Sequence, residues 1–248
     1  MNYKVTVAYN GSHYHGWAIQ KDVKTVQGAI QTTLYEIFKR KIKINGSGRT
    51  DAYVHAYAQV FNFKHKKLTL DGPTMTYALK RSLPKDIEII NVVVVDDTFH
   101  ARYHVLDKEY VYCINTNERH NIFQEDIIYQ YNQTIDINKI NKLAQEFVGE
   151  HDFLSFSTTQ IANSTRCIKS INIVEENGIV KIFVKGTGFL RNMVRMIVGN
   201  LLVYNNDKKS YEDIIKLLNN PKKGASITKA PGCGLYLLKV NYQKKFDI

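Results

Sequence analysis

Apolar residues in the first hundred positions recur with the spacing of strands in some stretches and of helices in others. Residues Tyr3–Tyr9 alternate apolar and polar side chains, which predicts a half-buried strand. Thr25 is a candidate N-cap, and the apolar residues from Val26 to Phe38 follow at helical spacing, which predicts an amphipathic helix. The other elements predicted in this half are strands at Ile42–Ile44, Gln59–Phe63 and Ile87–Val95 and a helix near Pro73–Leu83.

The second half repeats this order of elements. A strand at Tyr110–Asn115 precedes a helix at Ile137–Val148, whose apolar residues fall on one face. Asn177-Gly178 predicts the turn of a hairpin. The segment Phe189–Val203 is apolar almost all round, which predicts a buried helix. The remaining predicted elements are hairpin strands at Ile168–Val174 and Ile179–Lys185, a short helix with a capping box at Ser210 and Asp213, and a last strand at Leu235–Tyr242.

Two successive βαββαβ halves predict an α+β fold made of two ferredoxin-like units. We expect their sheets to join into one continuous, mostly antiparallel sheet, with helices on one face and a central cleft between the halves. The predicted domains are residues 1–104 and 105–248. The repeat is one of topology, because the two halves share no convincing residue-level identity.

The charge balance of the chain predicts what kind of partner it binds. The 248-residue chain has 34 Lys and Arg against 23 Asp and Glu, a net charge of +11. Such a surplus favours a polyanionic partner, most simply nucleic acid, because each neutralised phosphate releases counterions. A Lys-rich, solvated surface is the alternative interpretation.

Cysteine, histidine and hydropathy patterns argue against several other classes of protein. Three cysteines without C-x-x-C spacing favour neither a disulfide framework nor a zinc site, and they fit a reducing compartment. The pairs His13/His15 and His100/His104 lack the Cys or carboxylate that would complete a metal site. The sequence starts without an apolar signal segment and has no apolar run of membrane-spanning length. We therefore expect a cytoplasmic protein without a metal or a membrane association.

The segment Gly46–Ala56 (GSGRTDAYVHA) carries the main candidate for chemistry. Asp51 follows Arg49 by two residues, in a glycine-containing loop between two predicted strands, where functional residues concentrate. In a basic protein this carboxylate is a candidate nucleophile acting on an anionic substrate. The competing interpretation is an Asp that caps residues 52–57 or pairs locally with Arg49.

Arg195 favours the nucleophile interpretation. It lies among apolar residues on the predicted helix Phe189–Val203, and a buried guanidinium needs a counter-ion. Because no acidic residue lies within a turn on this helix, we expect the partner carboxylate to be distant in the sequence. A guanidinium that extends to solvent is the alternative. Arg191, placed one turn earlier on the same face, is a candidate phosphate contact.

Aromatic and arginine side chains supply candidates for nucleic-acid contact. Tyr110 and Tyr112 are two residues apart on a predicted strand, so their side chains lie on the same face. A Tyr that faces a cleft can stack on a nucleobase. The alternative is a core aromatic with a polar tip. Arg is the rarer cation in this chain, so each one suggests a need for planar, forked donation. The arginines in segments with other distinguishing features are Arg49, Arg102, Arg166, Arg191 and Arg195.

Nine segments of the chain resemble motifs of the tRNA pseudouridine synthase A family, in the family's order and nearly from end to end. One short motif would be weak, whereas nine in order are specific. The segments are YNGSHYHGW (9–17), TVQGAI (25–30), GSGRTDAYVHA (46–56), FHAR (99–102), KEYVY (108–112), HDFLSF (151–156), STRCI (164–168), GFLRNMVRMIVG (188–199) and APGCGLYL (230–237).

The resemblance implies a role for each matching residue. Asp51 corresponds to the family's catalytic aspartate, and Arg195 to the arginine that pairs with it. Tyr110 corresponds to the tyrosine that stacks on the target uracil and is proposed to accept its C5 proton. Arg49 corresponds to the arginine thought to help extrude the target nucleotide. Two positions depart from the family: Tyr53 stands where Gly is common, and Ala18 where Gln is common.

The implied reaction is the isomerisation of uridine to pseudouridine in tRNA, at positions 38–40 of the anticodon stem-loop. It needs no cofactor, because a carboxylate nucleophile and a closed pocket suffice. The resemblance also implies a homodimer that binds tRNA. Two alternatives differ from this prediction. The first is a non-catalytic protein with two RNA-binding ferredoxin-like modules, although the chain lacks the RNP1-type pattern usual in such modules. The second keeps the chemistry but acts on other tRNA positions or on other RNAs.

Overall fold

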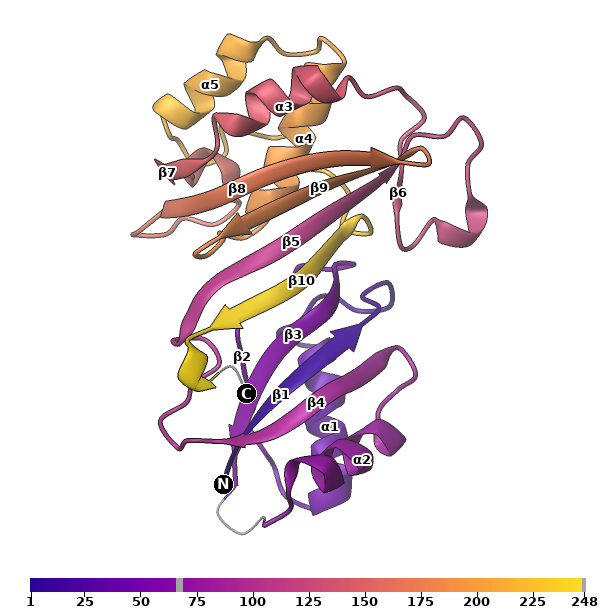
Figure 1. The fold of residues 1–248 in the computed structure, drawn as a ribbon, viewed down its shortest axis with the longest axis vertical. Helices are drawn as coiled ribbons and strands as arrows, with labels where there is room; N and C mark the ends of the chain where they lie inside the picture. Colours follow the sequence, from indigo (N-terminus) through magenta and orange to yellow (C-terminus); the bar gives the residue numbers. More distant parts are fainter. Residues whose placement is uncertain (66–68, 247–248) are drawn as a thin grey trace. The chain divides into compact units, whose positions relative to one another are not determined.

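The computed structural model describes residues 1–65 and 69–246, which form five α-helices and a mostly antiparallel arrangement of strands. This confirms the predicted α+β class. The chain divides into two compact units (Figure 1). Unit 1 comprises Met1–Leu106 and Tyr236–Ile248, and unit 2 comprises Asp107–Leu235. Over the described ranges, every helix is too short or too polar to cross a bilayer.

The sheet of unit 1 has the strand order β4-β1-β3-β10 (Figure 1). β1 lies between β4 and β3 and is antiparallel to both, whereas β10 runs parallel to β3. The short strand β2 pairs with β3. The bounds are β1 (Asn2–Tyr9), β2 (Asn45–Gly46), β3 (His55–Lys64), β4 (Ile87–Val95) and β10 (Leu235–Tyr242).

The helices of unit 1 are α1 (Val26–Phe38) and α2 (Gly72–Ser82), and both begin at a side-chain cap. Thr25 accepts a hydrogen bond from the backbone N–H of Gly28, which confirms the predicted N-cap. α1 and α2 contact each other, and α2 packs on β4. The core between helices and strands is fully buried and contains Tyr3, Val5, Val7, Ile30, Leu34, Met75 and Leu79.

The sheet of unit 2 has the strand order β5-β9-β8-β7, and all of these neighbours are antiparallel (Figure 1). β8 and β9 form the predicted hairpin, and both turn residues, Asn177 and Gly178, have positive φ as a tight hairpin turn requires. The short strand β6 runs parallel to β5. The bounds are β5 (Val105–Asn115), β6 (Tyr129–Gln130), β7 (Gly149–Asp152), β8 (Thr165–Glu176) and β9 (Ile179–Gly186).

Unit 2 contains the helices α3 (Ile137–Gln145), α4 (Met193–Asn205) and α5 (Tyr211–Asn219). α4 is buried over most of its surface, as its apolar sequence predicts. The capping box of Ser210 and Asp213 at the start of α5 is present, with hydrogen bonds in both directions.

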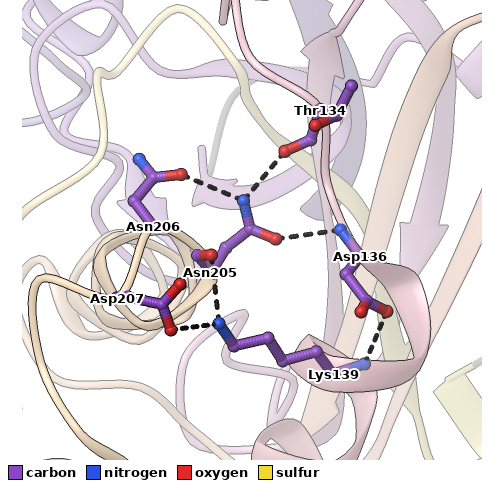
Figure 2. Close-up of polar contacts among 6 residues, drawn as sticks. All are labelled: Thr134, Asp136, Lys139, Asn205, Asn206 and Asp207. Carbon is purple, nitrogen blue, oxygen red and sulfur yellow. Dashed lines mark hydrogen bonds and ion pairs between the residues drawn. The ribbon is translucent and has the colours of Figure 1, made fainter.

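A polar cluster joins the end of α4 to the start of α3 (Figure 2). Asn205 accepts a hydrogen bond from the backbone N–H of Asp136 at 2.9 Å and donates to the carbonyl of Thr134 at 2.9 Å. Lys139 donates to the carbonyl of Asn205 at 3.2 Å and pairs with Asp207 at 2.6 Å. These contacts satisfy backbone groups at two helix ends, and they fix the C-terminal end of the helix that carries Arg195.

Two predicted helix bounds are wrong. α4 begins at Met193 instead of Phe189, because Asn192 has a φ of +63°, a left-handed conformation that a right-handed helix cannot include. α3 ends at Gln145 instead of Val148. The next three residues form hydrogen bonds to carbonyls three positions earlier, so the last turn tightens while Phe147 stays fully buried.

The strands next to the Asp51 loop also differ from prediction. No strand forms at Ile42–Ile44; the short pairing lies at Asn45–Gly46, opposite Asn62 and Phe61. Ile42 and Ile44 are buried without joining the ladder, so their alternation reflects core packing. β3 begins at His55, four residues before the predicted start. β6 and β7 were not predicted, because they are short and lack apolar alternation.

Candidate active site

The loop that carries Asp51 packs against the segment Tyr9–Trp17 of unit 1. Two backbone hydrogen bonds join them: Trp17 N–H donates to the Thr50 carbonyl at 3.1 Å, and Tyr53 N–H donates to the Tyr14 carbonyl at 3.2 Å. These bonds flank Asp51 on both sides. The first and third resembling motifs are therefore parts of one local structure.

The close approach of these two segments depends on Gly16. Its φ is +87°, and a Cβ placed on it would lie 2.6 Å from the Thr50 carbonyl oxygen and 3.0 Å from the carbonyl carbon of Asp51. Any other residue would be strained there and would push the Asp51 backbone away.

The other side of the loop is tied to β3 by buried polar groups. The Ser47 hydroxyl donates to Gln59 Oε1 at 2.6 Å, and Gln59 Nε2 donates to the Gly48 carbonyl at 3.2 Å. The hydroxyls of Tyr9 and Thr50 are 2.8 Å apart and hydrogen-bonded. Burial raises the pKa of Tyr9 well above its usual value, so this phenol stays protonated. The loop backbone is thus fixed from both sides.

Asp51 itself is half-buried and begins a turn, not a helix. The Val54 N–H donates to the carbonyl of Asp51 at 3.2 Å, and β3 starts at His55. The interpretation of Asp51 as the cap of a helix over residues 52–57 is therefore wrong, because the residues after it form a turn and a strand.

Tyr53 occupies a left-handed backbone position, with a φ of +65°. This conformation explains why Gly suits this position in the family that the loop resembles. Tyr53 is 51% exposed, and the centroid of its ring lies 6.3 Å from that of His15. A side chain at this position is therefore tolerated at the surface, at the cost of backbone strain.

Arg49 and Arg102 are both exposed in unit 1. The residues before Arg102 are firmly anchored: the Phe99 carbonyl accepts from the side-chain amide of Asn2 at 2.9 Å, and the Ala101 carbonyl accepts from the Tyr242 hydroxyl at 2.7 Å. The anchoring holds the segment to the core and leaves the guanidinium at the surface.

Tyr110 lies on β5 in unit 2 and is only 8% exposed. It is paired with Val184 of β9, and its ring meets that of Phe189 edge to face, with centroids 5.2 Å apart. Phe189 lies in the segment before α4. An edge-to-face contact fixes the plane of the Tyr110 ring, which a base-stacking residue requires.

Arg195 lies in the first turn of α4 and is half-buried, less enclosed than the sequence suggested. Its Nε donates to the Ala230 carbonyl at 2.8 Å, and the Ala230 N–H donates back to the Arg195 carbonyl at 3.0 Å. Its Nη1 donates to Asn192 Oδ1 at 3.2 Å. The segment at Ala230 and the cap residue Asn192 thus orient the guanidinium.

Asn192 is a functional candidate that sequence reasoning missed. Its Oδ1 accepts from Arg195, and its Nδ2 donates to the Thr158 hydroxyl at 2.9 Å. Its left-handed backbone keeps α4 from starting any earlier, and its side-chain amide lies beside the guanidinium. Asn is among the few non-glycine residues that adopt this conformation readily, and this is the signal that could have identified it.

The segment 230–234 also positions Tyr112. The Tyr112 hydroxyl donates to the Pro231 carbonyl at 2.8 Å, and a Cβ on Gly234 would lie 2.7 Å from the Tyr112 ring. Burial raises the pKa of Tyr112, and the nearby charge of Arg195 opposes that increase. Tyr112 is therefore a structural support beside Arg195.

The last two predicted contact residues differ from each other. Arg166, on β8, is half-buried and donates to the backbone carbonyls of Thr165 at 2.6 Å and Asn163 at 3.1 Å, and burial lowers its pKa. Arg191 is exposed and precedes the cap residue of α4. Its predicted place one helical turn before Arg195 is wrong, because α4 starts after it.

The structure thus groups the predicted site residues by unit. Asp51, Arg49 and Arg102 belong to unit 1, whereas Tyr110, Arg166, Arg191 and Arg195 belong to unit 2. Within the described ranges, no three His, Cys, Asp or Glu side chains come together as a metal-binding group.

The sequence model of one protein family, described as tRNA pseudouridine synthase, matches residues 5–104 and 143–243 of the chain. Similar proteins include tRNA pseudouridine synthase A of Malacoplasma penetrans, 43% identical over 98% of this chain and 100% of the relative. The enzyme of that name from Ureaplasma parvum serovar 3 is 45% identical with the same coverage. A solved structure of the archaeal box H/ACA sRNP Nop10–Cbf5 complex contains a chain that is 13% identical, with a TM-score of 0.35. The match covers 81% of this chain and 52% of that one, and the similarity is too weak to inform fold or function.

Proposed function

Because the chain belongs to the tRNA pseudouridine synthase family, whose enzymes isomerise uridine in tRNA, we propose that Asp51 is its catalytic nucleophile. In the reaction the N1–C1′ bond of uridine breaks and a C5–C1′ bond forms. The C5 proton leaves and N1 gains a proton, so the product is an isomer of the substrate. A carboxylate that attacks the target nucleotide can open this path.

The observation that carries this proposal is the fixed backbone around Asp51. Backbone hydrogen bonds from Trp17 and Tyr53 flank it, and the loop packs directly on the backbone of Gly16, where there is no space for a side chain. A nucleophile held in this way loses little freedom when the substrate binds.

Arg195 is proposed as the ion-pair partner of Asp51. An opposite charge favours the ionised carboxylate, which is the form that attacks. The contacts of Arg195 with Ala230 and Asn192 support the proposal, because they fix the orientation of the guanidinium. The pair would join residues of the two units, and it rests on the sequence argument.

Tyr110 is proposed to stack on the target uracil and to accept its C5 proton. The edge-to-face contact with Phe189 supports this role, because it holds the ring in one plane. The target base must first leave its own stack, at a cost of a few kcal/mol that stacking and phosphate contacts recover. Arg49 is proposed to assist the extrusion.

Phosphate contact is proposed for the remaining arginines. Arg49, Arg102 and Arg191 are exposed, as phosphate contact requires. Arg166 is half-buried and already donates to two carbonyls, so we assign it a contact from its remaining donors.

The finer substrate and assembly are also proposals. We propose that the enzyme modifies positions 38–40 of the anticodon stem-loop, works as a homodimer in the cytoplasm and needs no cofactor. The resemblance of the nine motifs supports these statements.

Two ferredoxin-like halves remain our proposal for the fold. The predicted domains, residues 1–104 and 105–248, differ from the two compact units at the last strand, because Tyr236–Ile248 belongs to unit 1. In unit 1, the order β4-β1-β3 with β2 on β3 is the order of such a half. In unit 2, the order β5-β9-β8 is consistent with a second one.

Release of tritium from tRNA labelled at uridine C5 tests the role of Asp51. The label leaves only when C5 bonds to C1′. We expect Asp51→Asn to lower the release rate by at least about 10³-fold, because the nucleophile is lost. Asp97→Asn, at an exposed Asp of the same unit, is the control and should match wild type. Release by Asp51→Asn at the wild-type rate would refute the proposal.

A further inference from the structure

Three aromatic rings of unit 1 form a continuous stack at the start of β3. The rings of His55 and Tyr236 are stacked at 4.6 Å with an interplanar angle of 21°, and those of Tyr236 and Tyr57 at 5.1 Å and 19°. The parallel register places Tyr236 of β10 opposite His55 of β3. Tyr57, which carries one of the two outer rings, is 56% exposed as a residue.

The inner end of the stack is fixed. His55 is 1% exposed, and its Nδ1 accepts a hydrogen bond from the Gly11 N–H at 3.0 Å. The neighbouring pair Ala56 and Leu237 is buried, and side chains alternate between the faces of a strand, so the rings project from the face opposite to this core contact. The Tyr57 ring is therefore held parallel to two rings beneath it.

We infer that the exposed face of Tyr57 is a stacking site for an unpaired nucleobase of the tRNA substrate, other than the target uracil. A flat ring with fixed orientation and one open face binds any base through its π-face. The net charge of +11 and the exposed Arg49 six residues before His55 suit the phosphates of such a strand.

The site lies close to the proposed nucleophile. Tyr57 follows Asp51 by six residues, so their Cα atoms are at most about 22 Å apart. The bound base would therefore be within a few nucleotides of the target, a statement that rests on the proposed role of Asp51. Tyr57 would then position the substrate strand before the target base enters the catalytic site.

Binding of tRNA to three variants tests the inference. Tyr57→Ala should raise the Kd for tRNA roughly 5- to 150-fold, the range for loss of one stacked base, and Tyr57→Phe should stay within about twofold. Tyr35→Ala, at an exposed Tyr on α1 of the same unit, should bind as wild type. Melting temperatures of the free proteins separate a folding defect from a binding defect.

A direct readout comes from tRNA that carries 2-aminopurine at single unpaired positions. At one position, binding should quench the fluorescence with wild type and Tyr57→Phe and leave it unquenched with Tyr57→Ala. An unchanged Kd in Tyr57→Ala, or quenching that does not depend on Tyr57, would overturn the inference. Because these assays measure binding, they are independent of tritium release by Asp51→Asn, so failure of either proposal is recognised separately.

Discussion

Two non-glycine residues with left-handed backbones flank the proposed catalytic groups, and they serve different ends. Tyr53 follows Asp51 by two residues with a φ of +65°, and Asn192 precedes Arg195 by three with a φ of +63°. The Asn192 side chain bonds Arg195 and Thr158, whereas the Tyr53 ring is half exposed. The same left-handed conformation supports side-chain hydrogen bonds in one place, and in the other a turn with a partly exposed ring beside His15.

The comparison extends to how each region is held. Main-chain hydrogen bonds and the absence of a side chain at Gly16 hold the Asp51 loop to the segment Tyr9–Trp17. Side-chain hydrogen bonds to Ala230 and Asn192 fix Arg195. Substitutions at Gly16 should therefore disturb the loop by adding atoms, whereas substitutions at Arg195 or Asn192 act by removing them.

Among the substitutions that test this comparison, the largest effect is expected when the Arg195 guanidinium is removed. Arg195→Met should lower kcat for tritium release by about 10²- to 10³-fold, because the carboxylate loses its proposed partner. Arg81→Met, at an exposed Arg on α2, is the matched control. A kcat within threefold of wild type in Arg195→Met would remove Arg195 from the mechanism.

Gly16→Ala should distort the Asp51 loop by addition of a single methyl group. We expect a loss of about 2–4 kcal/mol in the free energy of unfolding, measured with urea, together with a large fall in activity. Gly224→Ala is the control, since Gly224 also has a positive φ but a Cβ there would meet nothing within 4 Å. Equal losses in the two variants would show that backbone strain alone explains the effect.

Asn192→Gly should separate backbone strain from side-chain function. Gly keeps the left-handed conformation and loses both side-chain bonds, so we expect kcat to fall about tenfold with little change in KM. Thr158→Val removes only the outer bond of Asn192 and should have a smaller effect. Wild-type kcat in Asn192→Gly would mean that Asn192 only sets the start of α4.

Tyr53→Gly should give the smallest effect, and of opposite sign. Relief of the left-handed strain is offset partly by the greater freedom of Gly in the unfolded chain, so we expect stabilisation of up to about 1 kcal/mol. Activity should stay within twofold of wild type. Destabilisation on urea unfolding would show that the contact of Tyr53 with His15 outweighs the strain.

Regular elements with strong patterns could be predicted closely from the sequence. The β-branched run of β4 was predicted with its observed bounds, Ile87–Val95, and the Thr25 cap of α1 was identified. The start of α4 could not be predicted, because hydrophobic periodicity continues through Asn192 and does not report the sign of φ.

For the candidate site, residue type could identify Asp51, Arg195 and Tyr110, because each carries recognisable chemistry. It could not identify the carbonyls of Ala230 and Pro231, since every residue has a backbone acceptor and only the fold brings these two to Arg195 and Tyr112. The departure at Tyr53 acquires its explanation only when its backbone angle is known.

The last strand of the chain has a consequence for the order of events during synthesis. β10 pairs with β3 and belongs to unit 1, although more than a hundred residues of unit 2 separate it from the rest of that unit. Unit 2 is continuous and can fold as soon as it leaves the ribosome. Unit 1 cannot complete its sheet or its aromatic stack until Tyr236 has been translated, so unit 1 is completed only after the whole of unit 2 has been synthesised.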